Sequence, residues 1–142
     1  YFAGYPRIER FLIDVLNDCR EKGYVSTLLG RRRAIRGIRP VPTRQRNLPE
    51  RTAVNTVVQG SAADLIKKAM VAIHRRMQQQ RLNARLLLQI HDELVFEVSS
   101  QHLAHLASLV RDEMSGVYQL RVPLKVDLSA GPNWAQTSEI AL

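Results

Sequence analysis

The chain has 142 residues, 45% of them hydrophobic, and a net charge of +8, which fits one ordinary domain or a piece of a larger one. No hydrophobic stretch is long enough for a transmembrane helix, and no segment has the pattern of a signal peptide. Cys19 is the single cysteine, which excludes an internal disulfide and a multi-cysteine zinc site. A reducing compartment is therefore expected.

The first third of the chain predicts a helix, a short hairpin and a loop. Residues 5 to 22 place hydrophobic side chains at helical spacing, and Gly23 is a natural stop for this helix. Short strand-like pieces follow at residues 24 to 28 and 33 to 35. The next segment is interrupted by three prolines, so it predicts a loop: Pro40, Pro42 and Pro49.

Positive charge is concentrated in residues 31 to 51, which hold eight arginines, no lysine and one acid, Glu50, for a net charge of +7. The arginines are Arg31, Arg32, Arg33, Arg36, Arg39, Arg44, Arg46 and Arg51. Because the planar guanidinium fits phosphate oxygens, a nucleic-acid backbone is the favoured partner, with a solvated loop as the alternative. A membrane surface fits less well, since the prolines interrupt the segment and it has no hydrophobic face.

Residues 49 to 80 predict a long amphipathic helix. Its hydrophobic stripe consists of Leu65, Ile66, Ala69, Met70, Ile73 and Met77. The run Gly60-Ser61-Ala62-Ala63 is unusual inside it, because a helical glycine costs about 1 kcal/mol relative to alanine. Small side chains in succession allow close approach, either of a packed neighbour or of a ligand.

His91-Asp92-Glu93 lies between two runs rich in hydrophobic and β-branched residues, so residues 85 to 98 predict a β-hairpin tipped by two carboxylates. Alternation along the chain points Asp92 and Glu93 to opposite sides of the ribbon. A carboxylate raised into solvent suits a hard divalent cation such as Mg²⁺. The alternative is that Asp92 only forms the turn.

Residues 101 to 118 predict an amphipathic helix, and residues 122 to 128 alternate as a strand would. The inward side chains of that helix are Leu103, Leu106, Leu109, Val110 and Met114. The element order predicts an α+β fold in which long helices pack on a small, mostly antiparallel sheet.

Four ordered blocks of the sequence strongly resemble the C-terminal polymerase region of the DNA polymerase I family, family A: residues 23 to 33, 50 to 67, 89 to 98 and 122 to 134. The resemblance covers essentially the whole chain. It implies a polymerase palm with part of the fingers: residues 1 to 49 form the helix, hairpin and basic loop of the fingers/palm junction, and residues 50 to 142 form the C-terminal palm. The implied activity is template-directed transfer of a nucleotide from dNTP to a primer 3′-OH, with two Mg²⁺ ions.

The resemblance also assigns roles at the hairpin tip. Asp92 matches the palm aspartate that helps to hold the two Mg²⁺ ions, and Glu93 matches the adjacent, supporting acid, so both are candidate catalytic residues. His91 matches a residue that meets the primer terminus, with an ordinary structural histidine as the alternative.

Two further groups are candidate DNA contacts. Arg51, Asn55 and Gln59 are spaced by four and so share a helix face, which by resemblance lines the minor groove near the primer terminus. Without the resemblance, Asn55 and Gln59 would be ordinary polar surface residues. Arg31, Arg32 and Arg33 resemble the family's arginine run, for which contacts to backbone phosphates are expected, without an assignment to one of the three.

The family's first catalytic aspartate, its nucleotide-binding fingers helix and its thumb lie upstream of the matched region and have no counterpart here. We therefore expect a fragment, or one piece of a split polymerase, that is inactive alone. Its expected partners are primer-template DNA, dNTP and the remainder of the polymerase, with no membrane. The expected location is the cytoplasm with the nucleoid, or the host cytoplasm if the protein is viral. A non-catalytic nucleic-acid-binding module is the competing interpretation.

Overall fold

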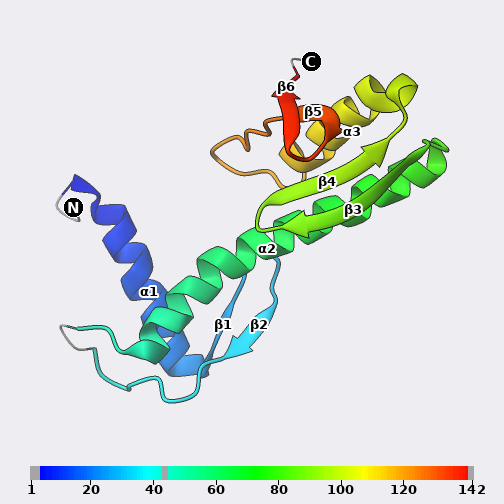
Figure 1. The fold of residues 1–142 in the computed structure, drawn as a ribbon. Helices are drawn as coiled ribbons and strands as arrows, with labels where there is room; N and C mark the ends of the chain where they lie inside the picture. The colour runs from blue at the N-terminus through cyan, green and yellow to red at the C-terminus, as the bar shows by residue number, and fades with distance from the viewer. Residues whose placement is uncertain (1–3, 43–44, 141–142) are drawn as a thin grey trace. The chain divides into compact units, whose positions relative to one another are not determined.

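The computed structural model describes residues 4–42 and 45–140 (Figure 1). In chain order its elements are α1 (Pro6–Lys22), β1 (Tyr24–Ser26), β2 (Arg32–Ala34), α2 (Leu48–Gln79), β3 (Ala84–Ile90), β4 (Glu93–Val98), the 3-10 helix η2 (Ser100–His102), α3 (Leu103–Ser115), β5 (Ser129–Asn133) and β6 (Gln136–Glu139). The described strands form three separate antiparallel pairs. The predicted α+β class, with long helices and small antiparallel sheets, is confirmed.

Internal contacts group the chain into two compact units, and the division falls inside α2, between Asp64 and Leu65. The expected boundary at residues 49 and 50 lies instead in the first turn of α2. That boundary concerns the fingers and palm roles of the two parts, and it stays a prediction. No helix in residues 4–42 and 45–140 is long and hydrophobic enough to cross a membrane.

The first unit has a small core built from α1, the hairpin β1–β2 and the N-terminal part of α2. Its buried side chains are Leu16, Cys19, Val25, Ile35 and Ala53. Helix α1 ends as predicted, because Gly23 takes the left-handed conformation with φ of 75° and its N–H donates to the Cys19 carbonyl. The hairpin that follows pairs Tyr24 with Ala34 and Ser26 with Arg32.

Helix α2 begins with a capping box. The Asn47 side-chain oxygen accepts the Glu50 backbone N–H at 3.0 Å, and the Glu50 carboxylate accepts the Asn47 N–H at 2.9 Å. The same carboxylate is only 1% exposed and pairs with Arg20 at 2.8 Å and Arg39 at 2.5 Å. Arg39, part of the predicted basic segment, is therefore engaged inside the protein. Arg44 of that segment lies outside the described residues.

Burial alone would raise the pKa of Glu50, but its hydrogen bonds outweigh this effect and leave the pKa lowered. The donors are the Arg39 guanidinium, the Asn47 backbone N–H and the Arg20 guanidinium. Glu50 therefore stays ionised in the core of the first unit.

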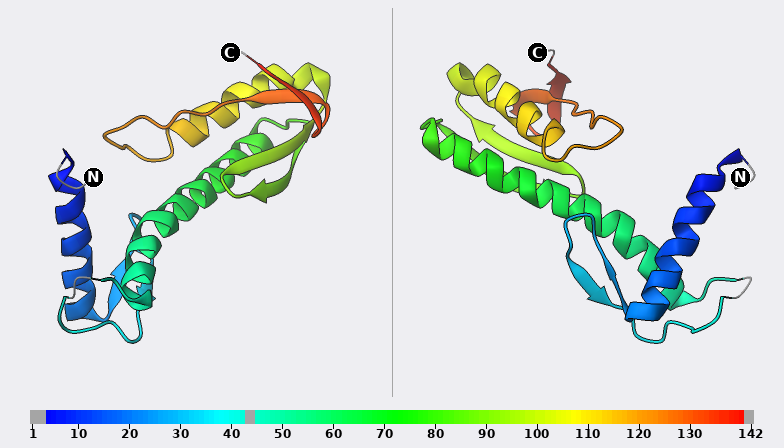
Figure 2. Two further views of the ribbon diagram at one scale, coloured as in Figure 1. Left: turned by 60° about the vertical axis from the view of Figure 1, so that its left-hand side comes forward. Right: turned by 180° about the vertical axis from the view of Figure 1, so that it is seen from behind.

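The second unit packs the C-terminal half of α2 against α3, and Figure 2 shows the β3–β4 hairpin beside that half of α2. The buried residues are Ala69, Ile73 and Met77 of α2 and Leu106, Leu109 and Val110 of α3. Partly buried Leu94, Phe96 and Val98 of β4 pack on this core. The predicted inward faces are confirmed at these buried positions and at Met114, whereas the other predicted residues are only half-buried: Leu65, Ile66, Met70 and Leu103.

The predicted strand at residues 122 to 128 was wrong. Residues 123–128 have no assigned secondary structure, and Val122 is 73% exposed. Pro123 has no N–H to donate to a sheet, and alternating side chains form a strand only where a partner strand is available. The pair that does form lies further on, as β5 and β6, with Ser129 opposite Glu139.

Candidate functional site

The tip of the β3–β4 hairpin is a two-residue loop, His91-Asp92, because Ile90 and Glu93 are directly paired. His91 has a φ of 53°, and Asp92 is not among the described residues with positive φ. Positive φ at the first central position alone is the pattern of a type II′ turn. The Gln89 side-chain amide donates to the His91 carbonyl and adds a second tie across the tip.

The His91, Asp92 and Glu93 side chains are all exposed, and none makes a hydrogen bond or ion pair with the described part of the chain. Asp92 does occupy the turn, yet its carboxylate is not used to stabilise it. Along β4 the side chains of Leu94, Phe96 and Val98 pack on the core, so Glu93 lies on the opposite, solvent-facing side. The tip therefore presents carboxylate oxygens to solvent.

Carboxylate oxygens are ligands that a hard divalent cation prefers, but these two side chains can supply only some of the ligands that the cation needs. Mg²⁺ is commonly held by one or two carboxylates together with water and substrate phosphates. Within residues 4–42 and 45–140, no group of three or more His, Cys, Asp and Glu side chains could enclose a metal ion. A magnesium site at this tip would therefore need further ligands from other groups.

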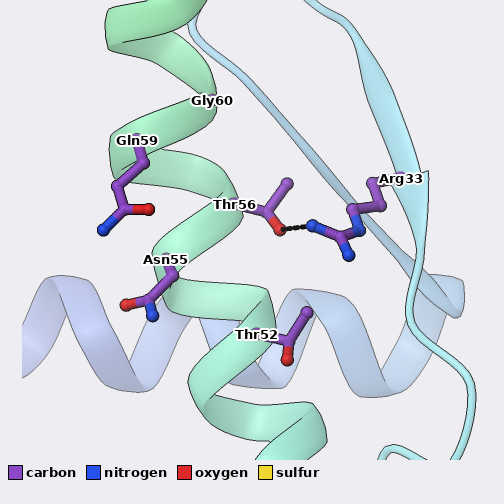
Figure 3. Close-up of a pocket in the computed structure, with 6 residues that line it drawn as sticks. All are labelled: Arg33, Thr52, Asn55, Thr56, Gln59 and Gly60. Carbon is purple, nitrogen blue, oxygen red and sulfur yellow. Dashed lines mark hydrogen bonds between the residues drawn. The ribbon is translucent and has the colours of Figure 1, made fainter. Parts of the chain in front are cut away.

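A second candidate surface lies on the N-terminal part of α2, where Arg51, Asn55 and Gln59 are all exposed. Figure 3 shows Asn55 and Gln59 projecting from the same side of the helix. Both line a pocket together with Arg33, Thr52, Thr56 and Gly60. Arg51 does not line this pocket, although its spacing places it on the same helix face.

The three consecutive arginines have three different environments. Arg31 pairs with Asp64 at 2.6 Å, and the Arg32 guanidinium lies 4.9 Å from the centre of the Tyr24 ring. Arg33 donates to the Thr56 hydroxyl at 3.1 Å, as Figure 3 shows. Of the three, only Arg33 lines the pocket with Asn55 and Gln59.

The small residues of α2 receive a packed neighbour from the chain itself. A Cβ added at Gly60 would stand 2.9 Å from the Thr27 methyl carbon, and the Ser61 hydroxyl accepts the Leu28 N–H at 2.8 Å. Of the two explanations left open by the sequence, close packing therefore applies at these two positions. Thr27, Thr56 and Asp64 were missed by the sequence interpretation. An acid inside a run of small and hydrophobic residues was the one available signal, and it points to Asp64.

Residues 1–136 match the family model of DNA polymerase family A. The chain belongs to this family. It is 46% identical over 134 residues to DNA polymerase I of Geobacillus stearothermophilus, an alignment that covers 94% of this chain. It is 47% identical over 142 residues to DNA polymerase I of Chloroflexus aurantiacus, covering 99% of this chain. The chain spans only 15% of the length of each of these relatives.

The fold supports the same membership in family A. A solved structure of the POL domain of Pol1 from M. smegmatis, in complex with DNA primer-template and dNTP, superimposes with a TM-score of 0.81. Its sequence is 44% identical, and the alignment covers 88% of this chain and 22% of that one. This family A chain therefore has the fold of part of a polymerase domain.

Proposed function

We propose that this chain is part of the polymerase domain of a DNA-directed DNA polymerase and contributes to nucleotide transfer from dNTP to a primer 3′-OH. The observation that carries the proposal is the exposed Asp92 carboxylate, which has no partner within the described residues and lies at a tight two-residue hairpin loop, in a chain that belongs to family A. Because the chain spans 15% of its relatives, we propose that activity requires the remaining polymerase, in the same polypeptide or as a partner chain.

In this proposal Asp92 holds Mg²⁺, and Glu93 supports it from the adjacent position. Two bound Mg²⁺ ions would align the reacting oxygens and stabilise the negative charge that develops between them. The chain's own contribution is a carboxylate carried on a backbone that a tight turn holds in place. The two-residue loop and the Gln89 contact hold the backbone at the tip, and no internal cation competes for Asp92 within the described residues.

The α2 face is proposed to bind the primer-template duplex. Asn55 and Gln59 carry amide donors that can reach the minor-groove acceptors A N3 and T O2, which both orientations of an A·T pair present. Arg51 and His91 are proposed to act near the primer terminus, and Arg33 to contact a backbone phosphate. Such contacts bind duplex DNA with little dependence on its sequence, as a template-directed enzyme requires.

The catalytic proposal is tested by primer extension with the assembled polymerase, meaning this chain together with the upstream portion. Asp92→Ala should reduce the extension rate at least about 100-fold, the scale of losing a group that stabilises transition-state charge. Glu97→Ala is the matched control, since Glu97 is an exposed acid on the solvent-facing side of the same strand. Equal extension by wild type and Asp92→Ala would leave only the non-catalytic binding module.

The DNA-binding proposal is tested by measuring affinity for primed template over a range of salt concentrations. Arg33→Ala should reduce the slope of log affinity against log salt by about 0.9, the value for one phosphate contact to duplex DNA. Asn55→Ala and Gln59→Ala should weaken binding without changing the slope, because neutral amides release no counterions. Arg75→Ala, exposed on the same helix, controls for loss of charge alone. An unchanged slope in Arg33→Ala would rule out its phosphate contact.

A further inference from the structure

We propose that Thr27 and Asp64 are positioning residues, which fix the β1–β2 hairpin on α2 and thereby place Arg33 beside the Asn55 and Gln59 face. This inference rests on the proposed function, because it assumes that Arg33 binds DNA there. It also gives each of the three consecutive arginines a different role. Arg31 holds the hairpin in place, Arg32 stacks on Tyr24, and Arg33 is left to contact the nucleic acid.

The first argument is the set of contacts that the buried Asp64 carboxylate makes with the hairpin. Its carboxylate is 5% exposed and engages the hairpin with both oxygens: one accepts the Thr27 hydroxyl at 2.6 Å and the other pairs with the Arg31 guanidinium at 2.6 Å. The Thr27 hydroxyl oxygen also accepts the Arg31 backbone N–H at 3.1 Å. A buried carboxylate needs such partners, so the network is lost as a whole if the hairpin moves from α2.

The second argument is the rigidity of the connection between the strands. The Thr27 N–H donates to the Arg31 carbonyl at 2.9 Å, and the Gly30 N–H donates to the Thr27 carbonyl at 2.9 Å. The Leu28 N–H donates to the Ser61 hydroxyl at 2.8 Å, and the Thr27 methyl group packs at Gly60. The turn is therefore closed on itself and attached to two successive residues of α2.

The third argument is the position of Arg33 in the strand. Residues two apart in an extended segment lie on the same side, so Arg31 and Arg33 both point to α2 while Arg32 points away. Arg31 reaches Asp64, and Arg33 reaches Thr56 further back along the helix. The Arg33–Thr56 hydrogen bond is exposed and has a neutral acceptor, so it is weaker than the buried Asp64 network. The network therefore sets where Arg33 lies.

A double-mutant cycle in the assembled polymerase tests this inference, with affinity for primed template at fixed salt as the readout. Thr27→Val keeps the side-chain shape but removes the hydroxyl, and Arg33→Ala removes the guanidinium. We expect each to weaken binding about tenfold, on the scale of one hydrogen bond to a charged group. If Thr27 acts through Arg33, the double variant should bind within about twofold of Arg33→Ala alone. Thr27→Ser, which restores the hydroxyl, should bind within about twofold of wild type.

Three results would count against the inference or its basis. Additive losses, about 100-fold in the double variant, would give Thr27 a general structural role and overturn the positioning role. If Arg33→Ala binds like wild type while Asn55→Ala binds weakly, the proposed function stands and the positioning role is overturned. If Arg33→Ala, Asn55→Ala and Gln59→Ala all bind like wild type, the proposed DNA face itself fails. Should Thr27→Val not fold, Asp64→Asn replaces it in the same cycle.

Discussion

The Thr27 methyl carbon lies 2.9 Å from the position that a Cβ atom would occupy at Gly60. Gly60→Ala would gain about 1 kcal/mol in helix propensity. However, Thr27 cannot rotate away without losing its hydrogen bond to Asp64, so we expect overpacking to dominate and destabilise the protein by about 1 to 3 kcal/mol. Denaturant unfolding of the wild-type assembled polymerase and of the same assembly with Gly60→Ala measures this difference in the free energy of unfolding.

The matched control is the double variant Gly60→Ala/Thr27→Ser, which removes the methyl group and retains the hydroxyl. Its stability should return to the wild-type value or exceed it by up to about 1 kcal/mol. A stabilised Gly60→Ala single variant would show that Thr27 yields to the new side chain and that the packing at this point is loose.

Removing the Glu50 side chain should be among the most destabilising single changes in the first unit. Glu50→Ala leaves the Arg20 guanidinium, 9% exposed, without its carboxylate and also removes half of the capping box. Breaking a buried ion pair in this way costs about 3 to 5 kcal/mol. Thermal or denaturant unfolding should show the loss, and Asp14→Ala, which breaks an exposed pair with Arg10, should change stability by less than about 1 kcal/mol.

The contribution of Glu50 should depend on pH in the acid range. Its pKa in the folded protein lies below the ordinary value of 4.5, so the folded state binds fewer protons than the unfolded state there. The stabilisation is therefore complete above pH 4.5 and is lost as the pH falls through the lowered pKa. The difference in unfolding free energy between wild type and Glu50→Gln should shrink over that window. A difference that stays constant would contradict the lowered pKa.

Substitutions of His91 should separate the effect of its backbone conformation from the effect of its imidazole ring. Because its φ is 53°, His91→Gly should leave the hairpin as stable as wild type or slightly more stable, whereas His91→Val should cost about 1 to 3 kcal/mol of strain. Both variants lack the imidazole. If that ring meets the primer terminus, both should slow primer extension similarly despite their different stabilities. Normal extension by His91→Gly would reduce His91 to a turn residue.

Cys19 should be almost unreactive in the folded protein. Its side chain is fully buried, and burial raises the pKa of the thiol, with the Arg20 charge opposing this only in part. Since the thiolate is the reactive form, alkylation by a maleimide should be far slower than in the unfolded chain. Labelling with and without denaturant measures the ratio at this position, with Cys19→Ala in the same assembly as the background control. Fast labelling without denaturant would contradict the packing of α1.

The local elements were predictable because their signals lie close together in sequence. Two hydrophobic runs on either side of the polar His91-Asp92-Glu93 located the hairpin, and periodicity located α2 and the inward face of α3. The strand at residues 122 to 128 was predicted wrongly because its pattern carries no information about a partner. Strand β5, with the sequence Ser-Ala-Gly-Pro-Asn, was missed since glycine and proline are typical of turns.

The pairing of charges could not be read from the sequence. Arg31 and Arg39 belong to a segment that predicts nucleic-acid binding, yet each pairs with a buried acid, Asp64 or Glu50. Arg31 is separated from its acid in sequence by β2, the loop that follows it and the first half of α2. Nothing in the local pattern distinguishes Arg31 from Arg33. Only the folded chain decides which guanidinium reaches which group. The roles of Asp92, Glu93 and the α2 face stay predictions that rest on the family and on their exposure.

The pairing near the hairpin tip also fixes the number of residues that this part of β3 can contain. Leu87 is the extra residue of a β-bulge, and between it and the two-residue loop every residue of β3 has a fixed partner, from Leu88 opposite Val95 to Ile90 opposite Glu93. One residue inserted between Gln89 and Ile90 would shift the register and turn the tip side chains to the other face of the ribbon. An insertion or deletion that leaves every carboxylate present would therefore still misdirect Asp92, and residue count in this segment is as constrained as residue identity.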